Sequence, residues 1–260
     1  MADLGFDGKV AIVTGAGGGL GRSHALELAH RGARVVINDL GGSVDGSGHA
    51  EGPAAAVVRE INDLGGEAVA NADSVATPEG GAAIVASAID AFGRVDIVVN
   101  NAAMSPGTLL HESSPLLFEK TYATNTLGPM LLASRCAERM RDAGGGVIIN
   151  VVTTGAFRPG AGLGLYCSSK AALHALTLVM AKEWATWGVR VNEIAPGPFL
   201  TDMMAPGAAN PEFTARMYDS MLIKRIADPT EIVGAALYLA SDASGFATGT
   251  TVTVDGGISA

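Results

Sequence analysis

The chain has 260 residues and a formal net charge of −9, because 26 acidic residues outnumber 17 lysines and arginines. An acidic chain disfavours nucleic acid or an anionic membrane surface as a partner recruited by bulk positive charge. Hydrophobic residues make up 48% of the chain, which excludes wholesale disorder, and no apolar run reaches the roughly 18 residues of a membrane span.

Short β-branched runs alternate with longer helical patterns along the whole chain. Strands are predicted at residues 10–15, 33–39, 67–73, 95–101, 146–152, 189–195 and 250–256. Helices are predicted near residues 20–31, 53–64, 78–92, 115–141, 165–187 and 229–241. This alternation predicts an α/β fold in which one doubly wound, seven-stranded parallel sheet carries helices on both faces. No repeat or linker divides the chain, so residues 1–260 are predicted to form a single domain.

Two segments interrupt this alternation. Residues 41–52 hold five glycines in twelve positions and are predicted to form a flexible loop, either a surface insertion or a flap near a ligand.

Residues 197–222 contain three prolines and four methionines in an unusually long connection. Long loops at the carboxyl ends of parallel strands commonly cover ligands, so we predict a substrate lid here; oligomer packing and plain surface are the alternatives.

The cysteine content and the N-terminal residues indicate the compartment. Only Cys136 and Cys167 occur, which is too few for a disulfide framework, and no His/Cys spacing suits zinc. Asp3 and Asp7 stand where a signal peptide would carry basic residues. We therefore expect a reducing compartment, the cytoplasm, with no signal peptide and no metal site.

A glycine-rich turn follows the first predicted strand. The sequence TGAGGGLGR at residues 14–22 carries Gly15, Gly19 and Gly21 just before a predicted helix. Backbone N–H groups and the helix dipole at such a turn hold a pyrophosphate. The literal G-x-G-x-x-G pattern is absent, and the missing lysine argues against an NTP-hydrolysing P-loop. The turn predicts dinucleotide binding, with an ordinary tight turn as the alternative.

Asp39 ends the second predicted strand, 18 residues beyond Gly21. At this place an acidic side chain accepts hydrogen bonds from the adenosine ribose and repels a 2′-phosphate, which favours NAD over NADP. Leu40 adds no positive charge, although Arg22 and the 41–52 loop leave a phosphate partner open. The alternative role of Asp39 is that of a turn former or helix cap.

Tyr166 and Lys170 lie four residues apart at the start of the predicted helix 165–187, which places both side chains on one helix face. A cation within about 4–6 Å lowers the pKa of a phenol by roughly 1–3 units from its usual value near 10. The pair therefore forms a usable general base. In isolation, the same spacing also arises by chance on amphipathic helices.

Taken together, TGAGGGLG, the NNAA at residues 100–103, the Tyr166/Lys170 pair and the PG at 196–197 resemble the short-chain dehydrogenase/reductase family in order and spacing. The resemblance covers essentially the whole chain and implies a Rossmann domain with a catalytic tetrad. That tetrad maps onto Asn125, a hydroxyl residue on the fifth strand, Tyr166 and Lys170. The family usually has Ser thirteen residues before the tyrosine; here that position is Thr153, with Thr154 as the fallback.

The resemblance also implies roles for these residues. Tyr166 would take the alcohol proton while hydride passes to the nicotinamide, and Thr153 would stabilise the substrate oxygen. Lys170 would lower the tyrosine pKa and bind the nicotinamide ribose, and Asn125 would hold a water. NAD is the implied cofactor, and its implied contacts are Gly15, Gly19, Leu20, Gly21, Asp39, Asp73, Ser74, Asn100, Tyr166, Lys170 and Thr201. For Asp73 a strand-end turn, and for Asn100 the satisfaction of buried backbone groups, are the alternatives.

A finer resemblance lies in INDLGGSVDGSG at residues 37–48 and its flanking segments, which are similar to the hydroxyacyl-CoA dehydrogenase domains of peroxisomal multifunctional enzymes and bacterial relatives. It implies a small-molecule substrate: a hydrophobic secondary alcohol such as a 3-hydroxyacyl thioester or a steroid-like alcohol. The rival hypotheses are a catalytically silent NAD-binding sensor or scaffold, and an epimerase or dehydratase that returns the hydride. The family also implies a homo-oligomer, a dimer or tetramer, packed through helices 115–141 and 165–187.

Overall fold

The computed structural model describes residues 4–41 and 52–260, so the predicted loop 41–52 lies almost entirely outside the described residues. Within them, seven strands form one parallel sheet in the order β3-β2-β1-β4-β5-β6-β7, as predicted. The strands are β1 (Val10–Thr14), β2 (Arg34–Asn38), β3 (Glu67–Asn71), β4 (Ile97–Asn100), β5 (Gly146–Val151), β6 (Val189–Pro196) and β7 (Thr251–Val254).

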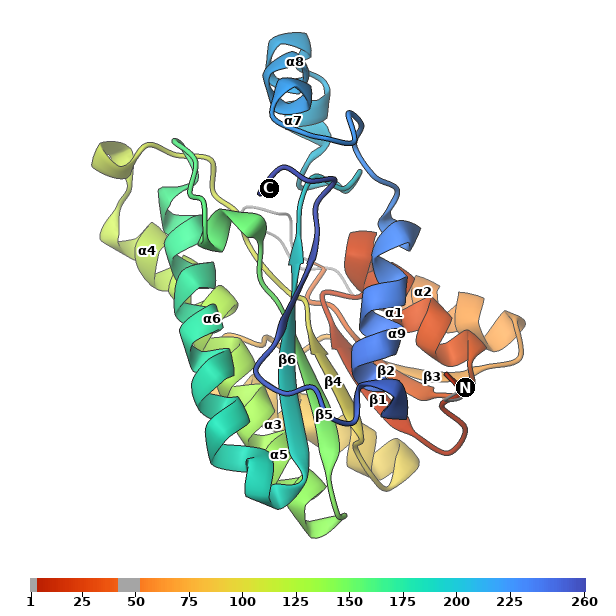
Figure 1. The fold of residues 1–260 in the computed structure, drawn as a ribbon. Coiled ribbons are helices and arrows are strands. Elements are labelled where there is room, and N and C mark those ends of the chain that lie inside the picture. The colour runs from red at the N-terminus through yellow and green to blue at the C-terminus, as the bar shows by residue number, and fades with distance from the viewer. Residues whose placement is uncertain (1–3, 42–51) are drawn as a thin grey trace.

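Helices cover both faces of the sheet, as the sequence predicts (Figure 1). One layer contains α1 (Gly19–His30), α2 (Gly52–Asp63) and α9 (Val233–Ala240); the other contains α3 (Pro78–Phe92), α5 (Gly128–Asp142) and α6 (Gly164–Trp184). Along β1, Ala11 and Val13 pack into the first layer's core, whereas Val10 and Ile12 pack into the second. Because both faces are covered, the central strands β1, β4 and β5 are largely apolar and buried instead of alternating.

The predicted helix over residues 115–141 is wrong in one respect, because a π-helical turn divides it. The segment consists of α4 (Pro115–Tyr122), the π turn Ala123–Leu127 and α5. Pro129 has no N–H to donate to the carbonyl of Asn125 four residues earlier, so the regular ladder is interrupted there. Gly128 N–H instead donates to the carbonyl of Ala123, five residues earlier, and Asn125 sits inside the widened turn.

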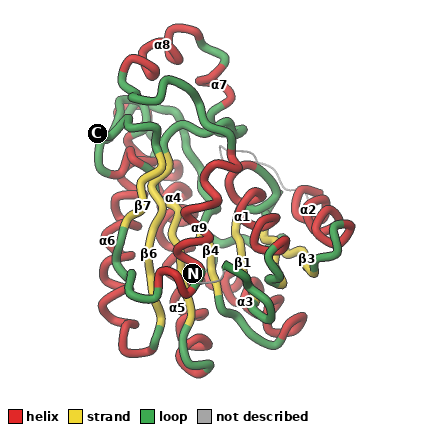
Figure 2. Tube along the Cα trace, turned by 45° about the vertical axis from the view of Figure 1, so that its right-hand side comes forward, coloured by secondary structure: helices red, strands yellow, loops and turns green. Residues whose placement is uncertain are grey.

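The predicted long connection after β6 is present and contains two helices that the sequence analysis did not foresee. These are α7 (Ala205–Ala208) and α8 (Pro211–Asp219), which project beyond the carboxyl ends of the strands (Figures 1 and 2). A bridge between Phe199 and Ala227 closes the base of the excursion. Of its methionines, Met217 and Met221 are buried and so belong to the core.

Among the described residues, no helix combines the length and the apolar composition needed to cross a membrane. Cys136 and Cys167 are both buried free thiols. The indole of Trp184 is buried against α5 and stacks on Trp187, so it completes the core of the second layer instead of forming exposed surface.

Candidate active site

The candidate site lies where the strand order reverses between β1 and β4, at the carboxyl ends of the sheet. There the turn after β1 is held by the residues after β4. The side-chain amide of Asn101 donates to the carbonyls of Thr14 and Gly15, at 3.0 Å each. The hydroxyl of Thr14 in turn accepts from the backbone of Asn101 at 3.1 Å. Our sequence analysis gave no role to Asn101; its place beside Asn100 at a strand end was the available signal.

Close backbone approach explains the glycines of the turn. Gly15 has φ +61°, and a Cβ there would lie 2.8 Å from the Cα of Ala102. At Gly21 a Cβ would overlap the carbonyl oxygen of Gly15. Gly19 has φ +51° and faces the side chain of Thr201. A turn without side chains leaves backbone N–H groups at the start of α1 open to an anion, which is the cradle that a pyrophosphate needs.

Asp39 lies against this turn and stabilises it, which is the alternative role; its contact with the ribose stays a prediction. Its two carboxylate oxygens accept from the backbone of Gly17 and of Gly41, each at 2.8 Å. Arg22, which from the sequence could have bound the 2′-phosphate of NADP, forms an ion pair with Glu60 at 2.6 Å. The guanidinium is therefore engaged by α2, and the charge at the turn is negative.

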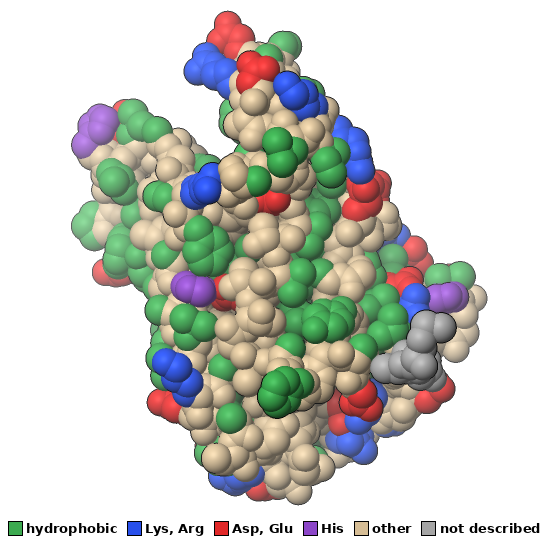
Figure 3. Space-filling model, viewed as in Figure 1, with side chains coloured by type: hydrophobic (Ala, Val, Ile, Leu, Met, Phe, Trp, Pro, Cys, Tyr) green, Lys and Arg blue, Asp and Glu red, His purple; other side chains and the backbone are tan. Residues whose placement is uncertain are grey.

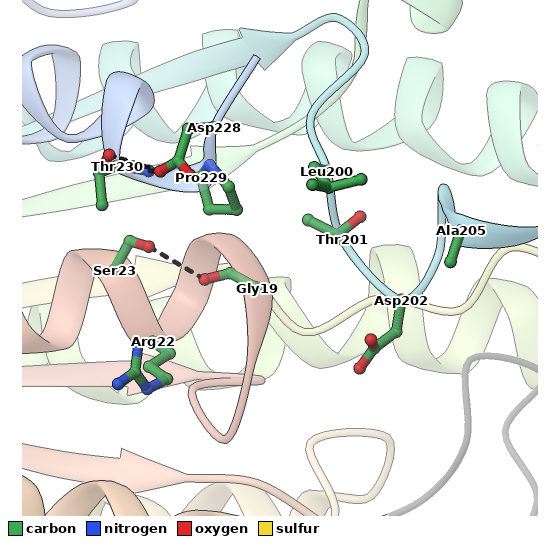
Figure 4. A pocket seen from close by; sticks show the side chains of 10 residues that line it. All are labelled: Gly19, Arg22, Ser23, Leu200, Thr201, Asp202, Ala205, Asp228, Pro229 and Thr230. Atoms are coloured by element: carbon green, nitrogen blue, oxygen red, sulfur yellow. Dashed lines mark hydrogen bonds between the residues drawn. The ribbon is translucent and has the colours of Figure 1, made fainter. Parts of the chain in front are cut away.

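A pocket of about 400 Å³ opens beside the turn (Figure 4). Its walls come from the start of α1, the loop after β6 and the segment before α9: Gly19, Arg22, Ser23, Leu200, Thr201, Asp202, Ala205, Asp228, Pro229 and Thr230. The structure thus brings Thr201 next to Gly19, although 182 residues of sequence separate them.

The other predicted cofactor residues lie at neighbouring strand ends. Asp73 is exposed, and its carboxylate accepts from the amide of Asn71 at 2.7 Å. The hydroxyl of Ser74 accepts from Ala76 in its own turn. Asn100 is buried and donates to the side chain of Asn150 at 2.8 Å, so it serves an internal network, and a cofactor contact from it stays a prediction.

The predicted hydroxyl, phenol and ammonium groups converge at the end of β5. Thr153 hydrogen-bonds the phenol of Tyr166. Its hydroxyl also accepts from the backbone of Gly155 at 3.2 Å. The fallback residue Thr154 turns away, and its hydroxyl donates to the carbonyl of Pro196 at 3.4 Å. Geometry therefore favours Thr153 as the partner of Tyr166.

Lys170 is 1% exposed, and its Nζ donates to the carbonyl of Val151 at 2.6 Å. Burial lowers the pKa of Lys170 to about 7. Burial also raises the pKa of Tyr166 to about 12, against the smaller lowering effect of the hydrogen bond from Thr153. The prediction of a lowered phenol pKa is therefore wrong for the protein by itself, because removing the phenol from water is the largest effect on Tyr166.

Asn125 is fully buried in the π turn. Its side chain accepts from the backbone N–H of Met104 at 2.9 Å and donates to the carbonyl of Met104 at 2.8 Å. The same amide donates to the hydroxyl of Ser169 at 3.0 Å. Both amide protons are therefore used to hold the loop after β4 against α6, and water binding by Asn125 stays a prediction.

Comparison with known proteins identifies the family. A family model described as enoyl-(acyl carrier protein) reductase matches residues 15–259. An uncharacterized oxidoreductase of Thermotoga maritima is 37% identical over 261 residues, covering 99% of this chain and 100% of its own length. A 7alpha-hydroxysteroid dehydrogenase of Escherichia coli K12 is 36% identical, covering 98% of this chain and 96% of its own. The chain belongs to the short-chain dehydrogenase/reductase family of oxidoreductases, whose named members here are dehydrogenases of CH–OH groups.

Solved structures agree with this assignment. A 7α-hydroxysteroid dehydrogenase complexed with NADH and 7-oxo glycochenodeoxycholic acid has a TM-score of 0.91 at 35% identity, covering 98% of this chain and 95% of that one. A gluconate 5-dehydrogenase from Burkholderia cenocepacia, in complex with NADP and tartrate, has a TM-score of 0.91 at 31% identity, covering 98% and 97%.

The finer resemblance to peroxisomal enzymes has a counterpart among the relatives. The peroxisomal hydratase-dehydrogenase-epimerase of Saccharomyces cerevisiae is 36% identical over 242 residues, which are 93% of this chain but only 25% of the yeast protein.

Proposed function

We propose that this protein is an NAD-dependent dehydrogenase that interconverts a hydrophobic secondary alcohol and its ketone. The observation that carries the proposal is the pairing of the Thr153 and Tyr166 hydroxyls at the same sheet edge as the glycine turn. Binding of a dinucleotide alone would need the turn but would not need that hydroxyl pair or a buried Lys170.

The turn fits a dinucleotide. Gly15, Gly19 and Gly21 leave room for a pyrophosphate at the start of α1, and Thr201 stands beside them. A bound nicotinamide supplies or accepts the hydride. Leu20, Asp73, Ser74 and Asn100 complete the proposed contact set, and Lys170 would bind the nicotinamide ribose.

NAD is favoured over NADP by the charges around the turn. Asp39 places a carboxylate against Gly17, where it repels a 2′-phosphate. Arg22 is paired with Glu60, and the sequence holds no lysine or arginine from residue 35 to residue 58. Since one similar structure holds NADH and another holds NADP, this charge arrangement is what supports the choice.

In the reducing direction, the phenol of Tyr166 donates its proton to the carbonyl oxygen as that oxygen becomes an alkoxide. The hydroxyl of Thr153 donates a hydrogen bond to the same oxygen and stabilises its developing charge. A phenol with a raised pKa holds its proton at neutral pH, which suits this acid role. In the oxidising direction Tyr166 takes the alcohol proton as a phenolate, a form that higher pH favours.

An apolar substrate is supported by the surface beside the site. Leu109 and Leu110, in the segment between β4 and α4, are exposed. Figure 3 shows a notch in the upper end of the molecule with hydrophobic side chains on both sides of it. The segment 197–222, with α7 and α8, forms the opposite projection and is the proposed lid. The steroid ligand of the similar hydroxysteroid dehydrogenase agrees with an apolar substrate.

The test is a spectrophotometric screen for NADH formation over steroid alcohols, 3-hydroxyacyl-CoAs and small cyclic alcohols, with gluconate and L-rhamnose as polar controls. We expect NADH to accumulate with an apolar alcohol and to do so faster than NADPH. NADH binding without turnover of any alcohol would leave the silent sensor or scaffold instead. Product formation without net NADH would indicate an epimerase or dehydratase.

We also propose that the chain forms a homo-oligomer through α4, α5 and α6. Large apolar side chains are exposed on these helices, among them Leu116, Phe118 and Val179. Buried in a contact between copies, they would contribute roughly 25 cal/mol per Å² of apolar area. Light scattering should give the mass of a dimer or tetramer. The cytoplasm remains the predicted compartment.

A further inference from the structure

A buried carboxylate that the proposed chemistry does not use lies on β6 beside Lys170. Glu193 is 1% exposed. Its Oε1 accepts from the Nδ1 of His174 and from the hydroxyl of Thr251, each at 2.6 Å. Its Oε2 is buried and, among the described residues, has no hydrogen-bond partner. One half of the carboxylate is therefore saturated, and the other half is not.

The fold explains why this carboxylate is close to Lys170. In the β5–β6 pairing, Glu193 is opposite Asn150, the residue before Val151, whose carbonyl accepts from the Lys170 Nζ. His174 follows Lys170 by four residues on α6, so both side chains lie on the helix face that meets this part of the sheet. The ammonium and the carboxylate thus share the space between α6 and the sheet.

Burial makes both charges costly and makes their attraction strong. An ionised group away from water is destabilised unless an opposite charge compensates it, and in a low-dielectric interior that compensation is large. Burial lowers the pKa of Lys170 to about 7, whereas the charge of Glu193 raises it. Glu193 therefore compensates part of the cost of the buried ammonium through its charge, without a direct ion pair between the two groups.

Within residues 4–41 and 52–260, no other acidic side chain contributes to the pKa of Lys170. The ionisable side chains that face it are Tyr166 and His174 on α6 and Glu193 on β6. The strands β5, residues 146–151, and β7, residues 251–254, contain no ionisable side chain.

We propose that Glu193 is a positioning residue of the reaction: its buried carboxylate favours the ammonium form of Lys170, and His174 and Thr251 hold that carboxylate in place. Its function in catalysis rests on the proposed function, since the ammonium matters there because it supports the Tyr166 phenolate and the nicotinamide ribose. The electrostatic statement itself concerns only this chain's own residues.

The experiment follows the charge of Lys170 directly, without substrate or cofactor. Lys170 is one of five lysines, so NMR of protein labelled with ¹³C at the lysine Cε gives few signals. The signal that disappears in Lys170→Arg is assigned to Lys170, and its shift is followed with pH. In Glu193→Gln we expect the midpoint of this titration to fall by about one pH unit or more, because the negative charge that raises the pKa of Lys170 has been removed.

Three further variants keep the test decisive. Glu193→Met also removes the charge, so either neutral variant suffices if the other does not fold. Glu193→Asp retains the charge, so the titration midpoint of Lys170 in this variant should lie close to that of the unmodified protein. Thr251→Val is the matched control, because it removes a hydrogen bond to Oε1 but leaves the carboxylate. A Lys170 midpoint unchanged in a folded neutral variant overturns the proposal.

A kinetic measurement separates this inference from the proposed function. If an alcohol substrate is found, the acid limb of kcat/KM against pH should move upward by about one unit in Glu193→Gln, because the phenolate loses the support of its ammonium. A merely structural role would lower the rate at every pH without moving the limb. If no alcohol turns over, the proposed function fails while the NMR titration still decides the role of Glu193.

Discussion

The two halves of the sheet prepare their parts of the site by different means. From β1 to β4, the turn at Gly15–Gly21 is defined by close backbone contacts and by two side chains: the amide of Asn101 donates to the carbonyl of Gly15, and the carboxylate of Asp39 accepts from the N–H of Gly17. From β5 to β7, the site consists of ionisable side chains removed from water, with Tyr166, Lys170 and Glu193 close together. The first half offers backbone N–H groups to a charged ligand, whereas the second half contains buried ionisable side chains of the protein itself.

This difference predicts how each half responds to substitution. In the first half an added methyl group acts by steric overlap, so stability and cofactor binding change together. In the second half a change of one polar atom alters charge or proton transfer with little change in volume, so turnover changes while binding persists.

The largest expected effect is that of Tyr166→Phe in the second half. Removing the proton-transferring hydroxyl should lower kcat by about 10³-fold or more. The affinity for NADH, measured by calorimetry, should stay nearly unchanged because the glycine turn is untouched. Tyr238→Phe, at an exposed tyrosine on α9, is the control and should keep full activity. A kcat near that of the unmodified protein would exclude Tyr166 as the acid–base group.

The second largest effect is expected from loss of the Thr153 hydroxyl, which should lower kcat by about 10²-fold. This is the scale of one lost hydrogen bond to a developing oxyanion. We expect Thr153→Val to lose this activity and Thr153→Ser to keep it, because serine retains the hydroxyl. Thr154→Val should be nearly silent, since that hydroxyl faces Pro196. Steady-state kinetics of the three variants checks the assignment, and the reverse pattern would transfer the role to Thr154.

His24 on α1 differs from the rest of the first half, because its side chain is ionisable and fully buried. Neither ring nitrogen has a partner among the described residues, and burial lowers its pKa to about 4 from 6.5. The unfolded chain therefore binds this proton more readily, so stability is lost as pH falls from about 6.5 to about 4, by about 3 kcal/mol in all. Urea unfolding across this range should show the loss.

Replacing His24 with leucine should flatten that part of the stability profile, because the titrating group is gone and no buried nitrogen is left unpaired. His30→Gln, at an exposed histidine that ends the same helix, should leave the profile as it is. An unaltered acid loss in His24→Leu would assign the effect to other groups.

Gly21→Ala tests the steric character of the first half. The methyl group would overlap the carbonyl oxygen of Gly15, and we expect a loss of about 1–3 kcal/mol in the free energy of unfolding, with weaker NADH binding. Gly107→Ala is the matched control, because no atom lies within 4 Å of its Cβ position. Equal stabilities of the two variants in urea would refute the close-contact explanation.

The smallest expected effect is the change in cofactor preference in Asp39→Asn. Loss of the negative charge should shift the NAD/NADP ratio of kcat/KM about tenfold toward NADP, within the 1–3 kcal/mol typical of a charged hydrogen bond. Asp63→Asn, at an exposed aspartate that ends α2, is the control for charge in general. An unchanged ratio would remove the ribose assignment from Asp39.

Local pattern determined much of this protein. The seven strands, the helices on both faces, the glycine turn and the Tyr166/Lys170 spacing all follow from residues near one another in sequence, where periodicity and steric rules act directly. The family resemblance, confirmed by the comparisons, added the hydroxyl of Thr153, which was predicted on the fifth strand and lies two residues after the end of β5.

Only the tertiary structure decided the rest. It placed the hydroxyl of Thr153 beside Tyr166 and that of Thr154 at Pro196, gave Asn101 its role at the turn and broke the helix at Asn125. It also reversed the expected direction of the Tyr166 pKa and placed Glu193 near Lys170. The physical reason is common to all of these: burial and hydrogen-bond partners come from segments far apart in sequence, so neither is written in any local pattern.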